Sequence, residues 1–210
     1  MKIIDCAQGS TEWFQARRGL VTASEVDALI TPLWKIRTGE GVETFLCRKV
    51  SEKLLGWSMD EINGGGGTWA MSQGEIVEKI ALPWFAFTYD CEPRRVGFCA
   101  HDTLPIGCSP DALLGAENGL EIKSPQPPTH LKYLLRGELP AEYRAQVHFS
   151  MFVTGRPRWT FVSFSRQLPP LVVHVERDPK IHAAIASALS AFSEQFNEAL
   201  AKVAALKGAA

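Results

Sequence analysis

The sequence predicts an α/β fold in which a central mixed β-sheet is flanked by helices. Residues 95–100, 110–114 and 120–123 are short apolar segments of the length and alternation typical of strands. Two further strand-like segments follow at residues 159–165 and 171–176. Segments with helical periodicity lie before, between and after these strands, and this mixture indicates helices packed on a sheet.

Helix-starting and helix-ending residues support the helical segments. The expected helices are residues 24–30, 42–55, 69–85, 142–154 and a C-terminal helix. Ser24 is a suitable N-cap for the first helix, and Gly56 closes the second. A glycine-rich loop at residues 63–67 leads into the third, which Pro83 bends or ends early.

The last two helices are predicted from their apolar faces. Tyr143, Val147 and Met151 form one stripe along the first of them. The C-terminal helix has a longer apolar face, made of Ile185, Leu189, Phe192, Phe196, Leu200 and Val203.

Composition restricts the class of protein. The chain has 210 residues, 46% hydrophobic and 21% charged, so we expect one globular domain over residues 1–210. Five scattered cysteines predict neither a disulfide framework nor a zinc site, and favour a reducing cytoplasm. The N-terminus is too short and acidic for a signal peptide, and no apolar run is long enough to span a membrane, so no membrane partner is expected. A net charge of -1 neither shows nor excludes a local basic surface for nucleic acid.

The most informative motif is Asp111 followed by Glu121-Ile122-Lys123. Two carboxylates supply the hard oxygen ligands that Mg²⁺ or Mn²⁺ prefers, and phosphodiester hydrolysis uses such ions. On a strand, Glu121 and Lys123 share one face while Ile122 points into the core. Lys123 would then lie beside a metal ligand, placed to act on the attacking water. The alternative interpretation is an amphipathic edge strand with an ordinary Glu/Lys pair.

Other segments offer weaker candidates. Arg17 and Ser24 combine a guanidinium with a hydroxyl at a helix start, which suits a phosphate, although a surface arginine and a plain N-cap explain them as well. Glu75 and Glu78 share a helix face and could add a metal-site carboxylate, or simply be solvated. Gln146 is placed to orient water or a phosphate oxygen.

Taken in order, five motifs resemble a known family. They are Trp…Arg-x-Gly-x-x-Thr-Ala-Ser, Gly-x-x-x-Glu-x-x-Ala, Cys-Ser-Pro-Asp, Gly-Leu-Glu-Ile-Lys-x-Pro and Gln-Val-x-x-Ser-Met-x-Val-Thr. This order, between about Trp13 and Glu176, is similar to that of phage lambda exonuclease and the YqaJ-type alkaline exonucleases. The resemblance implies the PD-(D/E)XK, restriction-endonuclease-like nuclease core.

The resemblance also implies roles for individual residues. The implied metal-site residues are Asp111, Glu121, the Ile122 carbonyl and, for a second ion, Glu78 rather than Glu75. Lys123 matches the lysine that acts on the water, and Gln146 matches a supporting glutamine. Arg17 and Ser24 match a pocket for the 5′-phosphate. Met71 matches a wedge that separates the terminal base pair, and Arg37 matches, after a small gap, a minor-groove arginine.

As a whole, the resemblance implies a processive 5′-to-3′ exonuclease on linear double-stranded DNA. Two Mg²⁺ ions, replaceable by Mn²⁺, would serve each active site, and 5′-phosphorylated ends would be preferred. A ring-shaped homotrimer, a single-strand annealing recombinase as partner, and a phage-encoded enzyme acting in the bacterial cytoplasm are further expectations. Two alternatives stay open: an endonuclease on the same core, and a non-catalytic DNA clamp.

Overall fold

The computed structural model describes residues 1–58, 61 and 80–208. Its strands form two mixed four-stranded sheets, with the orders β1-β3-β4-β2 and β5-β6-β7-β8. The first sheet comprises β1 (Lys2–Ile4), β2 (Val21–Thr22), β3 (Phe98–Ala100) and β4 (Ile106–Cys108). The second comprises β5 (Ala112–Leu114), β6 (Asn118–Lys123), β7 (Arg158–Ser163) and β8 (Leu171–Glu176). The predicted α/β class is confirmed, and the strands divide between two sheets instead of forming one.

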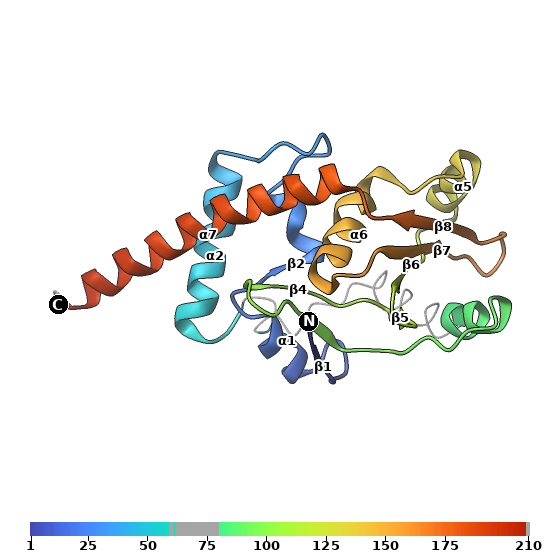
Figure 1. Cartoon of the computed structure of the whole chain (residues 1–210), viewed down its shortest axis with the longest axis horizontal. Coiled ribbons are helices and arrows are strands. Elements are labelled where there is room, and N and C mark those ends of the chain that lie inside the picture. The colour runs from blue at the N-terminus through green and yellow to red at the C-terminus, as the bar shows by residue number, and fades with distance from the viewer. Residues whose placement is uncertain (59–60, 62–79, 209–210) are drawn as a thin grey trace.

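Helices surround both sheets (Figure 1). They are α1 (Thr11–Arg17), the 3₁₀ helix η1 (Ala23–Ala28), α2 (Glu40–Leu55), α5 (Pro127–Arg136), α6 (Ala141–Thr154) and α7 (Pro179–Gly208). Residues 80–88 are also helical, so that helix continues past Pro83. The glycine-rich loop at 63–67 and the expected start of this helix lie outside the described residues.

Helix α6 connects the two sheets. It contacts β3 and β4 of the first sheet, β7 of the second, and both η1 and α7. Its Val147 and Met151 are fully buried against Trp159 and Phe161 of β7, with Tyr143 packed beside them. This is the apolar stripe that the sequence predicts. The same helix therefore fixes the positions of segments that are distant in the chain.

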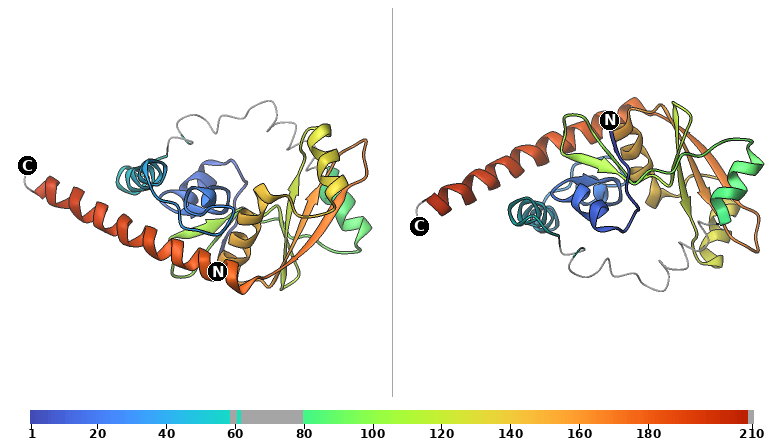
Figure 2. Two further views of the ribbon diagram at one scale, coloured as in Figure 1. Left: turned by 90° about the horizontal axis from the view of Figure 1, so that it is seen from above. Right: turned by 90° about the horizontal axis from the view of Figure 1, so that it is seen from below.

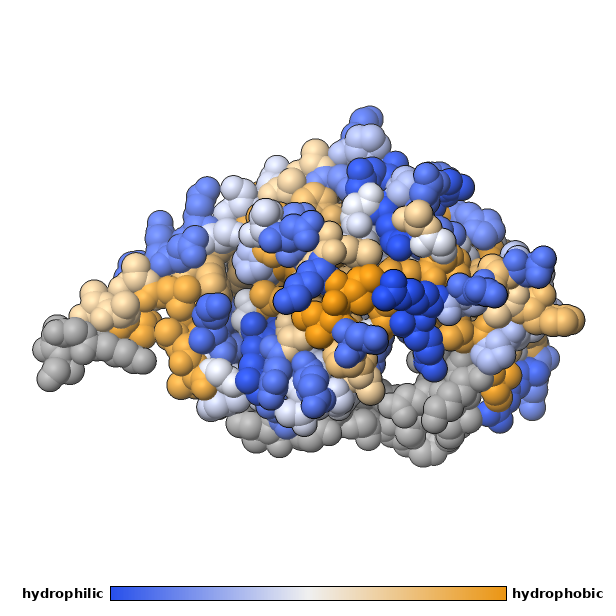
Figure 3. All heavy atoms as spheres, turned by 60° about the horizontal axis from the view of Figure 1, so that its bottom comes forward, coloured by the Kyte–Doolittle hydropathy of each residue, from blue (hydrophilic) through white to orange (hydrophobic). Residues whose placement is uncertain are grey.

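The long helix α7 packs along the molecule and extends past it. Its first five turns bury Ile185, Leu189, Phe192 and Phe196 in the larger core, as their spacing predicts. The C-terminal end of α7 projects beyond the other elements (Figures 1 and 2). On the face shown in Figure 3, hydrophobic residues are exposed among mostly hydrophilic ones. No helix in the described ranges is long and apolar enough to cross a bilayer.

Several element boundaries differ from the prediction. Ser24 is not an N-cap, because the cap residue of η1 is Thr22, and η1 ends at Ala28 instead of reaching residue 30. The strand expected at 95–100 is shortened to Phe98–Ala100. The strand expected at 110–114 begins only at Ala112, because Pro110 has no amide hydrogen for a ladder. Strands β1, β2 and β4 and helices α1 and α5 were not predicted; most of them are short segments without a periodic pattern.

Candidate active site

Asp111 lies at the connection between the two sheets. It follows the Ser109-Pro110 turn after β4 and directly precedes β5. Its amide donates to the Leu120 carbonyl at 3.1 Å, and its carboxylate Oδ2 accepts from the Ile122 amide at 2.5 Å. Both bonds hold Asp111 against β6. A carboxylate placed before the strand is thereby brought beside Glu121 and Lys123 on it.

Glu121 and Lys123 form a close ion pair, as the predicted alternation requires. Lys123 Nζ lies 2.7 Å from Glu121 Oε1, while Ile122 points to the other side of β6 and is 8% exposed in an apolar cluster. Glu121 is buried, at 4% exposure. Gln146 of α6 donates from Nε2 to the same Glu121 Oε1 at 2.7 Å. A buried carboxylate needs such partners, because desolvation without them is costly.

The charge state of Lys123 depends on these carboxylates. Burial lowers the pKa of the Lys123 ammonium, but Glu121 and then Asp111 outweigh that effect and raise it to about 12. The ammonium also lies 5.3 Å from the centre of the Tyr143 ring on α6. Lys123 is therefore a cation in the metal-free protein, held between two acids and an aromatic face.

The candidate phosphate-binding residues also meet in space. Arg17 Nη2 lies 3.4 Å from Thr22 Oγ1, and Ser24 Oγ lies 3.3 Å from the same atom. The Arg17 guanidinium packs on the Trp13 ring, with its carbon 4.1 Å from the ring centre. Arg17 is half-buried and Ser24 exposed, so both can be reached from solvent.

Trp13 and Thr22 contact the candidate site residues, although sequence reasoning assigned them no role. Trp13 Nε1 donates to Ser109 Oγ at 2.8 Å, and Ser109 belongs to the turn that leads to Asp111. Both residues are part of the first motif, which is the only sequence signal for them. Through Trp13, the Arg17 cluster and the Asp111 turn are joined by direct contacts.

Of the remaining candidates, Arg37 lies among the described residues and is not part of this cluster. Arg37 is exposed after η1, where its Nε donates to the Ile30 carbonyl at 3.3 Å and its side chain lines a shallow hollow with Asp27 and Val42. Glu78 and Met71 lie outside the described residues. Within residues 1–58, 61 and 80–208, no group of three or more His, Cys, Asp or Glu is placed to hold a metal ion.

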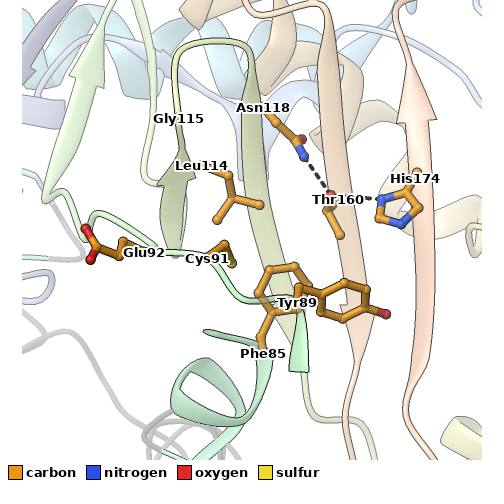
Figure 4. A pocket seen from close by; sticks show the side chains of 9 residues that line it. All are labelled: Phe85, Tyr89, Cys91, Glu92, Leu114, Gly115, Asn118, Thr160 and His174. Carbon is orange, nitrogen blue, oxygen red and sulfur yellow. Dashed lines mark hydrogen bonds between the residues drawn. The ribbon is translucent and has the colours of Figure 1, made fainter. Parts of the chain in front are cut away.

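A separate hollow of about 300 Å³ lies on the opposite face of the second sheet (Figure 4). Phe85 and Tyr89 stack along one side of it, with their ring centres 4.6 Å apart. Thr160 stands between Asn118 and His174, hydrogen-bonded to both at 3.0 and 3.2 Å. Asn118 and Glu121 are an odd number of residues apart on β6, so their side chains point to opposite faces of the sheet. This hollow is therefore not part of the candidate active site.

Comparison with known structures assigns the class of protein. The alkaline exonuclease LHK-Exo from Laribacter hongkongensis superposes with a TM-score of 0.82 at 27% identity, over 95% of this chain and 98% of that one. The same enzyme in complex with dAMP matches equally. A phage-related exonuclease from Haemophilus somnus 129PT shares the fold, with a TM-score of 0.58 at 13% identity over 96% and 97% of the two chains. The fold is thus that of the PD-(D/E)XK-type alkaline exonucleases, and the chain is a nuclease.

The family follows from the sequence model that matches the chain. Residues 12–157 match the YqaJ-like viral recombinase domain, and the chain belongs to this family. The resemblance seen in the five motifs is confirmed. No curated protein sequence matches the chain significantly.

Proposed function

We propose that this nuclease is a Mg²⁺-dependent, processive 5′-to-3′ exonuclease on linear double-stranded DNA. It releases mononucleotides from 5′-phosphorylated ends and leaves 3′ single strands for recombination by annealing. The observation that carries the proposal is the joined cluster of Asp111, Glu121, Lys123 and Gln146. An ordinary edge-strand Glu/Lys pair would be exposed, whereas Glu121 is buried and has a dedicated amide partner.

The donor set fits a hard divalent cation. The Asp111 and Glu121 carboxylates and the Ile122 carbonyl are all oxygen ligands, which Mg²⁺ and Mn²⁺ accept. Glu78 is assigned to a second ion, directly or through water. Two such ions would stabilise the attacking and leaving oxygens of an in-line displacement.

The residues of the chain divide the remaining work. Lys123 orients the attacking water and helps remove its proton, and Gln146 holds Glu121 in position. Arg17 and Ser24 bind the terminal 5′-phosphate through charge-assisted hydrogen bonds. Each cleavage exposes a new 5′-phosphate, whose attraction to Arg17 draws the duplex forward. Met71 is assigned to the terminal base pair and Arg37 to the minor groove.

Processivity is assigned to a ring-shaped homotrimer that encloses the duplex. Its partner would be a single-strand annealing recombinase, and its place of action the cytoplasm of a phage-infected bacterium. The net charge of -1 supports assembly, because it gives the subunits little mutual repulsion. Light scattering without DNA should therefore show a trimer; a monomer at micromolar concentration would contradict the ring.

The decisive experiment compares the rates at which DNA substrates with different ends are digested. Linear duplexes with 5′-phosphate or 5′-hydroxyl ends, and circular duplex, are digested with Mg²⁺ or with EDTA. We expect rapid Mg²⁺-dependent loss of 5′-phosphorylated linear duplex, slow loss of the hydroxyl form, and intact circles. Cleavage of circles would indicate an endonuclease, and no cleavage at all would indicate a DNA clamp.

Arg17→Ala tests the phosphate pocket within the same experiment. It should reduce the preference for phosphate and shorten processive runs, while slow distributive cleavage continues at the intact metal site. Arg158→Ala is the matched control, because Arg158 is exposed on β7 and, among the described residues, its ion-pair partner is the exposed Glu117. Equal preference in wild type and Arg17→Ala would remove Arg17 from the pocket.

A further inference from the structure

A buried ionic network joins α2 to the segment between α1 and η1. Lys49 of α2 is 3% exposed, and its ammonium lies 3.0 Å from Glu25 Oε1 and 3.1 Å from Glu52 Oε2. Glu52 is 5% exposed. Arg48 adds a second positive charge, 2.7 Å from Glu25 Oε1. Charges withdrawn from water this far are stable only when they are paired, so the network holds its members together.

The two carboxylates fix the backbone of the turn Gly19–Thr22, before β2 and at its last residue. Glu52 Oε2 accepts from the Gly19 amide at 3.0 Å. Glu25 Oε2 accepts from the Thr22 amide at 3.2 Å and from the Thr22 hydroxyl at 2.7 Å. The ammonium of Lys49 therefore holds both ends of this short turn through one carboxylate each.

Glycine at position 19 allows the turn to approach α2 this closely. Gly19 has φ +68°, in the left-handed region, and a Cβ there would lie 3.2 Å from the Cβ of Lys53. Any other residue would be strained and would press against α2. The amide of Gly19 thereby comes within hydrogen-bonding reach of Glu52.

The network continues to the candidate phosphate-binding residues. The single hydroxyl hydrogen of Thr22 is donated to Glu25. Its oxygen therefore accepts from Arg17 Nη2 at 3.4 Å and from the Ser24 hydroxyl at 3.3 Å. Arg17 and Ser24 are thus held by Thr22, Thr22 by Glu25, and Glu25 by Lys49.

The charge of Glu25 gives this network an electrostatic role as well as a packing role. Only Thr22 lies between the Glu25 carboxylate and the pair Arg17 and Ser24 in this chain of hydrogen bonds. Without compensation, the negative charge of Glu25 would repel a phosphate bound by Arg17 and Ser24. Lys49 and Arg48 compensate that charge. We propose that Lys49 is a positioning residue of the 5′-phosphate pocket: it neutralises Glu25 beneath the pocket and fixes Thr22, so that Arg17 and Ser24 meet the terminal phosphate without repulsion. This inference rests on the proposed function.

The test compares Lys49→Met with two double variants of equal net charge. All are assayed on linear duplex with 5′-phosphate or 5′-hydroxyl ends, and Arg158→Met serves as the single-charge control. For Lys49→Met we expect the KM for 5′-phosphorylated ends to rise roughly tenfold, the size expected for a charge-assisted interaction. The kcat and the rate on 5′-hydroxyl ends should stay at the wild-type level, because the metal site is not touched.

The double variants separate charge from folding. Lys49→Met/Glu25→Gln removes the negative charge under the pocket, and the amide oxygen can still accept from Thr22, so the KM should return toward wild type. Lys49→Met/Glu52→Gln removes the other carboxylate and leaves Glu25 without its ammonium, so the KM should stay high. Thermal melting establishes that each variant is folded.

Three results would overturn different statements. If wild type shows no preference for 5′-phosphate, the proposed pocket itself is wrong. Suppose instead that wild type prefers 5′-phosphate and Arg17→Ala loses that preference, so that the pocket is correct. The role of Lys49 alone is then wrong if Lys49→Met keeps the preference, or if the two double variants have equal KM. An equal loss of rate on both end types would show that Lys49 acts on folding alone.

Discussion

Gln146 donates a 2.7 Å hydrogen bond from its amide nitrogen to Oε1 of the buried Glu121. The same oxygen faces the Lys123 ammonium, also at 2.7 Å. Helix α6 therefore does two things at once: it packs both sheets together, and it holds the carboxylate assigned to the metal. Because of this hydrogen bond, a shift of α6 would also move the Glu121 carboxylate on β6.

Replacing Gln146 should weaken metal binding more than folding. Gln146→Ala removes the only α6 donor to Glu121 among the described residues, and we expect about a 10- to 100-fold loss of activity at limiting Mg²⁺. High Mg²⁺ should recover part of that loss. Rates measured across a Mg²⁺ titration test this, with Gln167→Ala, an exposed loop residue, as control. An unchanged Mg²⁺ dependence would reduce Gln146 to a packing residue.

The placement of Glu121 beside Lys123 was predicted from the sequence better than the folded framework around it. Period-two alternation places Glu121 and Lys123 on one face of any strand, and this local rule needs no tertiary information. The long helices α2, α6 and α7 were likewise predicted, α2 from its closing Gly56 and α6 and α7 from the spacing of their apolar residues. Whether Glu121 would be buried or exposed was not predictable, because its partner Gln146 comes from a different element.

The missed strands depend on distant contacts. Strands β1, β2 and β4 are two or three residues long; β1 and β4 pair with β3, and β2 pairs with β4. The cap of η1 was assigned to Ser24, but the cap residue is Thr22. Its amide donates to Glu25, three residues further on, in a local capping box that the sequence analysis did not use.

Asp111 is expected to be required for chemistry and not for the fold. Asp111→Asn keeps an oxygen that can accept from the Ile122 amide but removes the negative charge that a metal needs. We expect no Mg²⁺-dependent digestion, with binding to duplex ends preserved in Ca²⁺. Gel-shift and digestion assays measure the two separately, with exposed Asp90→Asn as control. Substantial cleavage by purified Asp111→Asn, or by Asp111→Ala, would refute the assignment of this site.

Lys123 should contribute through its proton as well as its charge. Lys123→Ala should lose activity by a factor on the order of 10² or more, the usual range for a positioned acid or base. Lys123→Arg keeps the charge, but a guanidinium does not give up a proton, so it should also be impaired. Lys180→Ala, at an exposed position, is the control. Near-normal rates in Lys123→Arg would mean that Lys123 supplies only charge.

Acid should destabilise the protein partly through Glu25. Burial raises the pKa of this carboxyl, but Lys49, Thr22 and Arg48 outweigh it and hold the pKa below its ordinary 4.5. A lowered pKa in the folded state means stability that is present above pH 4.5 and is lost as the pH falls through the folded value. Melting temperatures between neutral pH and about pH 3 should therefore fall less steeply in Glu25→Gln than in wild type. Parallel curves for the two proteins would show that Glu25 does not contribute.

Substitutions of Trp13 can separate the preference for 5′-phosphorylated ends from the rate of cleavage. Its indole nitrogen donates to Ser109, on the turn before Asp111, while its ring face supports the Arg17 guanidinium. Trp13→Phe keeps a ring for Arg17 but loses the hydrogen bond, so turnover should fall on both end types while the preference for 5′-phosphate survives. Trp13→Leu loses both contacts, and its phosphate preference should also fall, by roughly the several-fold expected for a partly desolvated cation–π contact.

Initial rates on 5′-phosphate and 5′-hydroxyl duplexes, measured at saturating Mg²⁺, give both quantities for each Trp13 variant. The exposed Trp57→Phe at the end of α2 controls for loss of an indole elsewhere. If Trp13→Phe lost the phosphate preference while keeping its turnover, the hydrogen bond to Ser109 would serve the phosphate pocket and not the Asp111 turn. If Trp13→Leu matched Trp13→Phe in both quantities, the ring would give Arg17 no support, and Thr22 would be the contact that positions the guanidinium.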